Sequence, residues 1–167
     1  RHMNRLVERH WEIARYWEAE YFDGLKLPLS PNAIDKTRPT FDTVGHAIKT
    51  YESIRLNDPT GPRADDAIMA TAGIHFRRKR YEDADYHYTL LRREYPRSEF
   101  QFEAHLLGLQ SKLLKYQGPD YDGAALVEAK RLANQLARQF SGRLSAEEKE
   151  RLRTVRAELN GQVVERE

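Results

Sequence analysis

Histidine is the residue type of this chain that most readily suggests metal binding, and five of its six histidines stand at positions 10, 46, 75, 87 and 105. Helical metal sites usually carry two histidines three or four positions apart, as in the HExxH pattern. None of these five has a second histidine at that spacing, and the chain contains no cysteine. The sequence therefore predicts no metal site. An enzymatic or metal-dependent alternative would need His75 and His87 to meet a carboxylate in the folded chain.

Two aspartates in the segment GPDYDG, Asp120 and Asp122, have the spacing that opens a calcium-binding loop. The third oxygen ligand and the closing glutamate of such a loop are missing from the sequence. Glycine, proline and aspartate are also the residues that commonly form turns. We therefore expect a loop of turns here and no calcium ion.

Nucleophilic catalysis also lacks a recognisable set of residues. The serines at 53, 98, 111 and 141 have no histidine close by in the sequence that would activate them. A glycine-rich phosphate loop and a GxSxG motif are both absent from the sequence. The sequence thus predicts a protein that is not an enzyme, has no cofactor and takes no small-molecule substrate.

The run RRKR at 77–80 could contact phosphates, and neighbouring aromatic rings could stack on bases. Glu82, Asp83 and Asp85 follow at once and weaken the local positive field. Cations are favoured at the C-terminus of a helix, so a solvated helix end is the preferred interpretation and no nucleic-acid partner is expected. Nucleic-acid binding remains the alternative function. It requires the convergence on one face of Arg77, Arg78, Arg80, Arg92 and Arg93.

The composition favours an extended helical protein that folds in water. The 167 residues include 28 basic and 26 acidic side chains, which are interspersed and leave a formal charge of only +2. Hydrophobic residues make up 40% of the chain and the mean hydropathy is −0.82, so a core can form while much surface stays exposed. No apolar run approaches the roughly 18 residues that mark a transmembrane helix, so we expect no transmembrane segment.

Seven prolines, at 28, 31, 39, 59, 62, 96 and 119, separate windows of helical periodicity. Ser98 with Gln101 and Ser145 with Glu148 have the spacing of a capping box, and Pro62 suits a first helical turn. No alternation typical of strands competes with these signals. We therefore expect an all-α protein of about seven helices, near residues 4–23, 42–57, 63–80, 81–95, 99–116, 123–140 and 145–165.

An internal repeat links these helices. Ala47, Tyr51, Ile54 and Pro59 match Ala84, Tyr88, Leu91 and Pro96 at a separation of 37 residues, and the same shift carries Ala67 onto Ala104. A third copy, Ala129, Leu136 and Phe140, lies 45 residues beyond Ala84, Leu91 and Tyr95, which places an eight-residue insertion at 116–123. Small residues at fixed positions let helices approach, and rings fill the space between them.

These repeated positions resemble the tetratricopeptide repeat, whose second helix carries a small residue, an aromatic residue, an aliphatic residue and a proline in this order. The match covers residues 42–140. In the third copy Ala133 replaces the ring and Ser141 the proline, and in a first helix His75 replaces a ring. The resemblance implies an α-solenoid of antiparallel helix pairs, with residues 1–167 forming one repeat domain.

The segment FRRKRYEDADYHYTLLRREYPRS is more narrowly similar to repeats of BamD-like lipoproteins of the YfiO or ComL type, which act in outer-membrane β-barrel assembly. That resemblance implies a non-catalytic scaffold that binds other proteins or extended peptides. It further implies a periplasmic, outer-membrane-associated location with a possible lipid anchor upstream of this chain. A cytoplasmic location stays open.

In the resembling folds the first helix of each pair lines a concave, peptide-binding surface. The repeat register places ten residues of this chain there. The alternative is that the leucines among them are core residues. The ten are Asp66, Met69, Gly73, Phe76, Arg77, Glu103, Leu106, Gln110, Leu113 and Leu114.

The two ends of the sequence give further expectations. Arg1, His2 and Met3 have the form of an expression scar. Trp11 and Trp17 are expected to cap a helical stack, with an aromatic docking patch as the alternative. In the last helix, Leu152, Val155, Leu159 and Val163 share one face. Because no second helix follows it, we expect the chain to be cut from a longer array and part of this face to stay open or covered by another molecule.

Overall fold

The computed structural model describes residues 2–23, 43–115 and 123–164, and within these ranges every regular element is an α-helix. The predicted all-α class is therefore confirmed. Asp120 and Asp122, the two aspartates of the expected turn loop, lie outside the described residues. The helices are α1 (His2–Asp23), α2 (Thr43–Asn57), α3 (Ala64–Arg77), α4 (Tyr81–Glu94), α5 (Gln101–Lys115), α6 (Gly123–Gln139) and α7 (Ala146–Val164).

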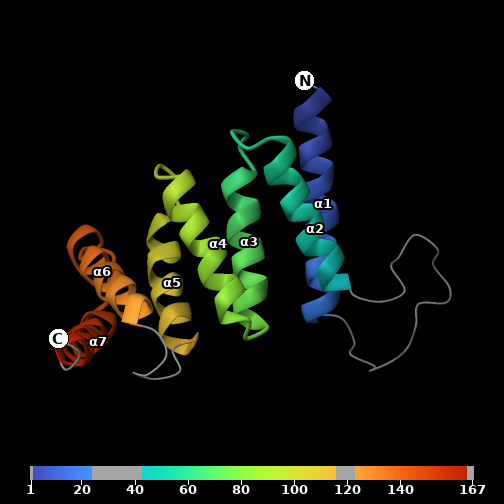
Figure 1. Cartoon of the computed structure of the whole chain (residues 1–167). Helices are drawn as coiled ribbons and strands as arrows, with labels where there is room; N and C mark the ends of the chain where they lie inside the picture. The colour runs from blue at the N-terminus through green and yellow to red at the C-terminus, as the bar shows by residue number, and fades with distance from the viewer. Residues whose placement is uncertain (1, 24–42, 116–122, 165–167) are drawn as a thin grey trace, which may run out of the picture. The chain divides into compact units, whose positions relative to one another are not determined.

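Two compact units make up the chain, Arg1–Arg78 with α1–α3 and Lys79–Glu167 with α4–α7. In the first unit, α2 packs against both α1 and α3, and the three helices run in alternating directions (Figure 1). In the second unit each helix packs against the next along the chain. The predictions of a solenoid and of a single domain stay predictions.

Most helix boundaries fall within a few residues of the predicted ones, but α3 ends at Arg77, three residues early. The amide of Arg78 still donates to the carbonyl of Ile74 at 3.1 Å. Lys79 then adopts a φ of 60°, in the left-handed region that breaks a helix. The chain thus makes its turn without glycine or proline, so the usual stop signals of a helix are missing here.

One predicted capping box is confirmed and the other is wrong. Glu148 accepts a hydrogen bond from the amide of Ser145 at 2.8 Å, and Ser145 Oγ accepts one from the amide of Glu148 at 3.2 Å. The bond from the Ser145 amide lowers the pKa of the Glu148 carboxyl. Gln101, in contrast, donates to the carbonyl of Tyr95 at 2.8 Å, and Ser98 Oγ accepts from the amide of Phe100 at 3.2 Å. Gln101 therefore caps the end of α4 instead of closing a box with Ser98.

The repeated small, aromatic and aliphatic positions are buried in both units. Ala47, Tyr51 and Ile54 of α2 are at most 1% exposed and pack with Val7 and Ala14 of α1. Trp11 and Trp17 are partly buried against the same cluster. In the second unit the matching residues of α4 are fully buried: Ala84, Tyr88 and Leu91.

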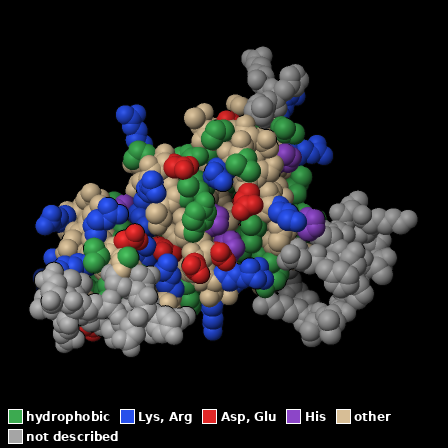
Figure 2. Space-filling model, viewed as in Figure 1, with side chains coloured by type: hydrophobic (Ala, Val, Ile, Leu, Met, Phe, Trp, Pro, Cys, Tyr) green, Lys and Arg blue, Asp and Glu red, His purple; other side chains and the backbone are tan. Residues whose placement is uncertain are grey.

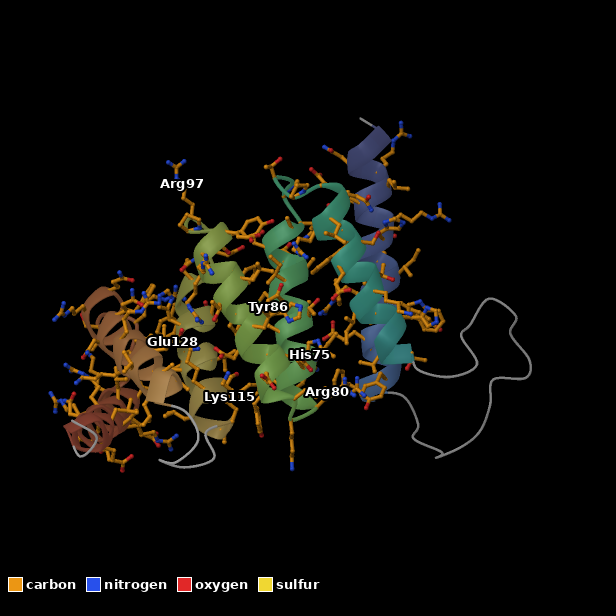
Figure 3. All side chains as sticks on the ribbon, viewed as in Figure 1. His75, Arg80, Tyr86, Arg97, Lys115 and Glu128 are labelled. Carbon is orange, nitrogen blue, oxygen red and sulfur yellow. The ribbon has the colours of Figure 1, made fainter. Side chains whose placement is uncertain are left out.

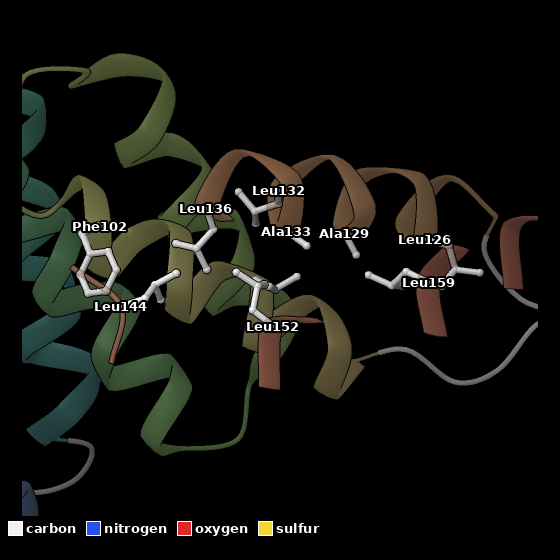
Figure 4. Packing of buried hydrophobic residues seen from close by; sticks show 10 residues of the cluster. Phe102, Leu126, Ala129, Leu132, Ala133, Leu136, Leu144, Leu152 and Leu159 are labelled. Atoms are coloured by element: carbon white, nitrogen blue, oxygen red, sulfur yellow. The ribbon is translucent and has the colours of Figure 1, made fainter. Parts of the chain in front are cut away.

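The third copy packs between α5, α6 and α7 (Figure 4). Ala133 stands at the ring position and is fully buried, and Leu136 beside it is also fully buried. The predicted packing of the last helix on α6 is confirmed for Leu152 and Leu159, which are 7% and 3% exposed. Val155 and Phe140 are partly buried against this cluster, and the side chain of Val163 lies outside the described residues.

No helix in the described ranges is both long and apolar enough to cross a membrane. This agrees with the expectation that the chain has no transmembrane segment.

Replacing a helical glycine by alanine should have opposite effects on stability at Gly73 and at Gly108. A Cβ at Gly73 of α3 would meet no atom within 4 Å, so Gly73→Ala should raise the free energy of unfolding by about 0.5–1 kcal/mol. A Cβ at Gly108 of α5 would overlap Arg92 Nη1 and lie 3.3 Å from Tyr88 Cβ, so Gly108→Ala should lower it by about 1–3 kcal/mol. Urea unfolding measures both. Equal effects of the two substitutions would contradict the packing described for Gly108.

Candidate functional site

The five α3 residues predicted to line a binding surface share one side of that helix, because their spacing repeats every three or four positions. Met69, Gly73 and Phe76 in its middle are half-buried, and the space over Gly73 is open. Asp66 and Arg77 flank them and are both bonded to charged partners. This side of α3 therefore presents a partly apolar strip between two charged ends.

A buried carboxylate holds one end of the strip. Glu18 of α1 is 8% exposed and accepts hydrogen bonds from Tyr51 Oη of α2 at 2.7 Å and from Arg77 of α3, and Arg15 lies 3.5 Å away. The Arg77 guanidinium also lies 3.7 Å from the centre of the Phe22 ring. Burial, and then the bond to Glu18, raise the pKa of the Tyr51 hydroxyl. Glu18 thus connects all three helices of the first unit.

A second bridge holds the other end of the strip. Arg63, which precedes α3, donates two hydrogen bonds to the carboxylate of Glu8, at 2.9 and 3.1 Å, and one to Asp66 at 2.9 Å. Its guanidinium also lies 5.0 Å from the centre of the Trp11 ring. The hydrogen bond between Arg63 and Glu8 lowers the pKa of the Glu8 carboxyl and raises that of Arg63. This forked geometry is the most specific arrangement that an arginine offers to a carboxylate.

We call the strip from Asp66 to Arg77, together with its two bridges to α1, the bridged face. The bridges fix α3 relative to α1 at two points about 14 residues apart, a distance of roughly 21 Å along a helix. Their charges are already compensated, so a ligand need not strip water from unpaired ions there. The arrangement is therefore a partly apolar strip whose end charges are paired within the first unit.

The five predicted residues of α5 divide into two groups. Leu106 and Leu113 are partly buried against the core of the second unit, which favours the core interpretation for both. Gln110 is exposed and Leu114 is 54% exposed. Glu103 is half-buried and accepts a hydrogen bond from Arg143 at 2.9 Å. Only part of the predicted surface on α5 is therefore open.

A buried ion network in the second unit was not predicted. Lys112 of α5 and Asp85 of α4 pair at 2.9 Å, with side chains only 6% and 7% exposed. Lys112 also reaches Glu128 of α6 at 2.8 Å, and Lys115 lies 3.2 Å from Asp85. Figure 3 labels Lys115 on α5 and Glu128 on the neighbouring helix α6. The hydrogen bond from Lys112 lowers the pKa of Glu128. The only sequence signal was that Asp85 directly follows the buried Ala84.

Three of the five arginines required for the nucleic-acid alternative are engaged within their own unit. Arg77 and Arg78 lie over the rings of Phe22 and Tyr21. Arg92 donates to the carbonyl of Ala104 at 2.6 Å and to Thr89 at 2.7 Å, and burial lowers its pKa to about 10. Acidic and basic side chains are also interspersed on the face shown in Figure 2. These contacts give the alternative little support.

The described part of the chain contains no group of three or more histidine, aspartate or glutamate side chains that could hold a metal ion. His105 is 6% exposed, and its Nδ1 lies 2.6 Å from the carbonyl oxygen of Gln101. Its ring centre lies 5.0 Å from that of Phe140. These contacts are those of a core histidine.

Comparison with known proteins finds no protein-family model that matches this chain and no curated protein with significant similarity to it.

The bridged face depends on the bond between Tyr51 and Glu18. Tyr51→Phe should lower the free energy of unfolding by about 1–3 kcal/mol, because it removes a buried hydrogen bond to a charged group. Tyr86→Phe is the matched control: Tyr86 is 61% exposed, so the change should stay within about 0.5 kcal/mol. Chemical unfolding followed by circular dichroism measures both. A Tyr51→Phe variant as stable as the control would contradict the role given to Glu18.

The burial of His105 predicts a pH dependence of stability. Burial lowers the pKa of its imidazole in the folded chain, so the unfolded chain, with a pKa of about 6.5, binds the proton more readily. The free energy of unfolding should therefore fall as the pH drops below about 6.5, and His105→Leu should reduce that fall. Unfolding at pH 5–8 measures the slopes. Identical slopes in the two proteins, or an NMR titration midpoint of His105 above 6.5, would contradict this prediction.

Proposed function

We propose that the protein is a non-catalytic helical-repeat scaffold that binds a partner protein or an extended peptide on the bridged face. The observation that supports this most is Gly73, which has open space above it in the middle of the strip. Met69 and Phe76 on either side offer half-exposed apolar surface, while Asp66 and Arg77 are bonded within the first unit. A partner could bury the apolar strip without leaving a charge unpaired.

The fixed ends of the strip and the open space above Gly73 fit a binding surface better than a core. Its ends are fixed by bonds to α1, so little ordering of side chains would be needed when a partner docks. A missing Cβ lets a ligand backbone or side chain approach the helix closely. The mode of recognition would be that of an extended segment contacting side chains spaced along one helix.

We further propose that this scaffold is a tetratricopeptide-repeat protein that works in the cell envelope, like the BamD-like proteins that its sequence resembles. The support is the 37-residue repeat, whose small, aromatic and aliphatic positions are all buried in α2 and α4. Fractionation of the cells that make the protein tests the location. Recovery with the outer membrane is expected, and recovery with the cytosol would contradict the envelope role.

Peptide binding to the bridged face can be tested by filling the space above Gly73. Peptides selected by phage display on the whole chain serve as probes, and fluorescence anisotropy measures their affinity. Gly73→Leu should weaken binding by about tenfold or more, because the new side chain occupies the centre of the strip. The fold should persist, since leucine is a good helix former and nothing lies within 4 Å of that site.

Gly161→Leu is the matched control, because a Cβ there also meets no atom within 4 Å and Gly161 lies on α7. It should leave the affinity unchanged. A selected peptide that binds Gly73→Leu as tightly as the unmodified chain would show that the bridged face is not its site. Failure to select any peptide would count against the scaffold function.

A further inference from the structure

A pocket of about 310 Å³ lies between the C-terminal end of α6 and the first half of α7. Its apolar floor is formed by Ala137, Leu144 and Leu152. Leu144 and Leu152 are 5% and 7% exposed, so the core of the second unit supports this floor from below. The pocket belongs wholly to the second unit and does not involve the bridged face.

Three cations line the pocket, Lys149, Arg153 and Arg156, all on α7. Arg156 is positioned by a hydrogen bond from its Nε to Asn134 Oδ1 of α6 at 2.9 Å. Arg153 lies 3.2 Å from Glu150, but both side chains are more than 70% exposed, so this pair is weak and easily exchanged. Ser141 completes the lining, and none of the described residues that form it is acidic.

We propose that this pocket binds an acidic amphipathic segment of a partner protein. An apolar side chain of that segment inserts between Leu144 and Leu152, and its carboxylates pair with Arg153, Lys149 and Arg156. The argument is charge complementarity: a concave apolar floor lined by three cations and by no described acidic residue matches a ligand that is apolar on one side and acidic around it. A nucleic acid would use the cations but would leave the apolar floor without a function.

The basic rim lies on one side of α7. Lys149, Arg153 and Arg156 recur at spacings of four and three residues, so they share a helix face. Arg151 lies well away from that face, with a side chain 75% exposed that pairs with Glu147 at 2.6 Å. The same helix therefore offers a matched control: Arg151→Glu and Arg153→Glu change the net charge equally but on different faces.

Fluorescence anisotropy with a synthetic probe tests the proposal on the whole chain. The probe is a fluorescein-labelled, glutamate-rich peptide with leucines at every third or fourth position, so that it forms an amphipathic helix. Arg153→Glu should weaken binding by about tenfold or more through like-charge repulsion, and Arg151→Glu should change it by less than about twofold. Circular dichroism checks that each variant is folded; Lys149→Glu replaces Arg153→Glu if that variant is not.

A second probe, with the leucines replaced by serine, separates the apolar anchor from the charge. It should bind at least about tenfold more weakly than the first, since the floor then has no partner. No binding of the leucine probe, or equal effects of the two arginine substitutions, would overturn the proposal. The proposal would also be overturned, in favour of a polyanion site, if the two peptides bound equally and duplex DNA bound more tightly than either in a way that depends on Arg153. None of these outcomes depends on the bridged face.

Discussion

Each unit of this protein depends on one buried carboxylate. In the first unit Glu18 accepts bonds from Tyr51 of α2 and Arg77 of α3; in the second, Asp85 of α4 pairs with Lys112 of α5, which also reaches α6. A carboxylate taken out of water costs several kcal/mol unless donors surround it. A shift of any partner helix along its axis would remove those donors. The carboxylates therefore select one helix register among the many that apolar packing alone would tolerate.

The fixed helix register also determines which surfaces of the first unit stay exposed. Alanines at the repeated positions let neighbouring helices approach closely, and rings such as Tyr51 fill the space between them. Because Ala67 and Ile74 pack α3 into the core of the first unit, the residues between Asp66 and Arg77 on its bridged face need not all contribute to that core, and they can form a half-exposed strip with a glycine at its centre. The strip proposed for binding thus shares Asp66 and Arg77 with the bonds that stabilise the first unit, while Met69, Gly73 and Phe76 between them stay half-exposed.

Local signals predicted most of the fold and only part of the candidate site. Proline positions, helical periodicity and the box of Ser145 with Glu148 act within a few residues, so they could be read from the sequence and hold in the structure. Gln101 bonds a carbonyl six residues earlier, at Tyr95, and this choice depends on how two helices meet. The burial of Asp85, the fit of Arg92 over Gly108 and the division of the α5 leucines into core and surface are non-local as well. These features depend on which helix packs against which, and the hydrophobic periodicity of a single helix does not contain that information.

The central claim is that buried carboxylates fix the register of the helices. A double-mutant cycle on Asp85 and Lys112, with the free energy of unfolding as the readout, tests it most directly. Lys112→Met should cost about 3–5 kcal/mol, because it leaves a buried carboxylate without its main partner, and adding Asp85→Leu should recover most of that loss. The exposed pair of Arg151 and Glu147 provides the reference, with an interaction of about 0.2–1 kcal/mol. A coupling between Asp85 and Lys112 no larger than this reference would contradict the account, because the buried carboxylate would then not fix the helices.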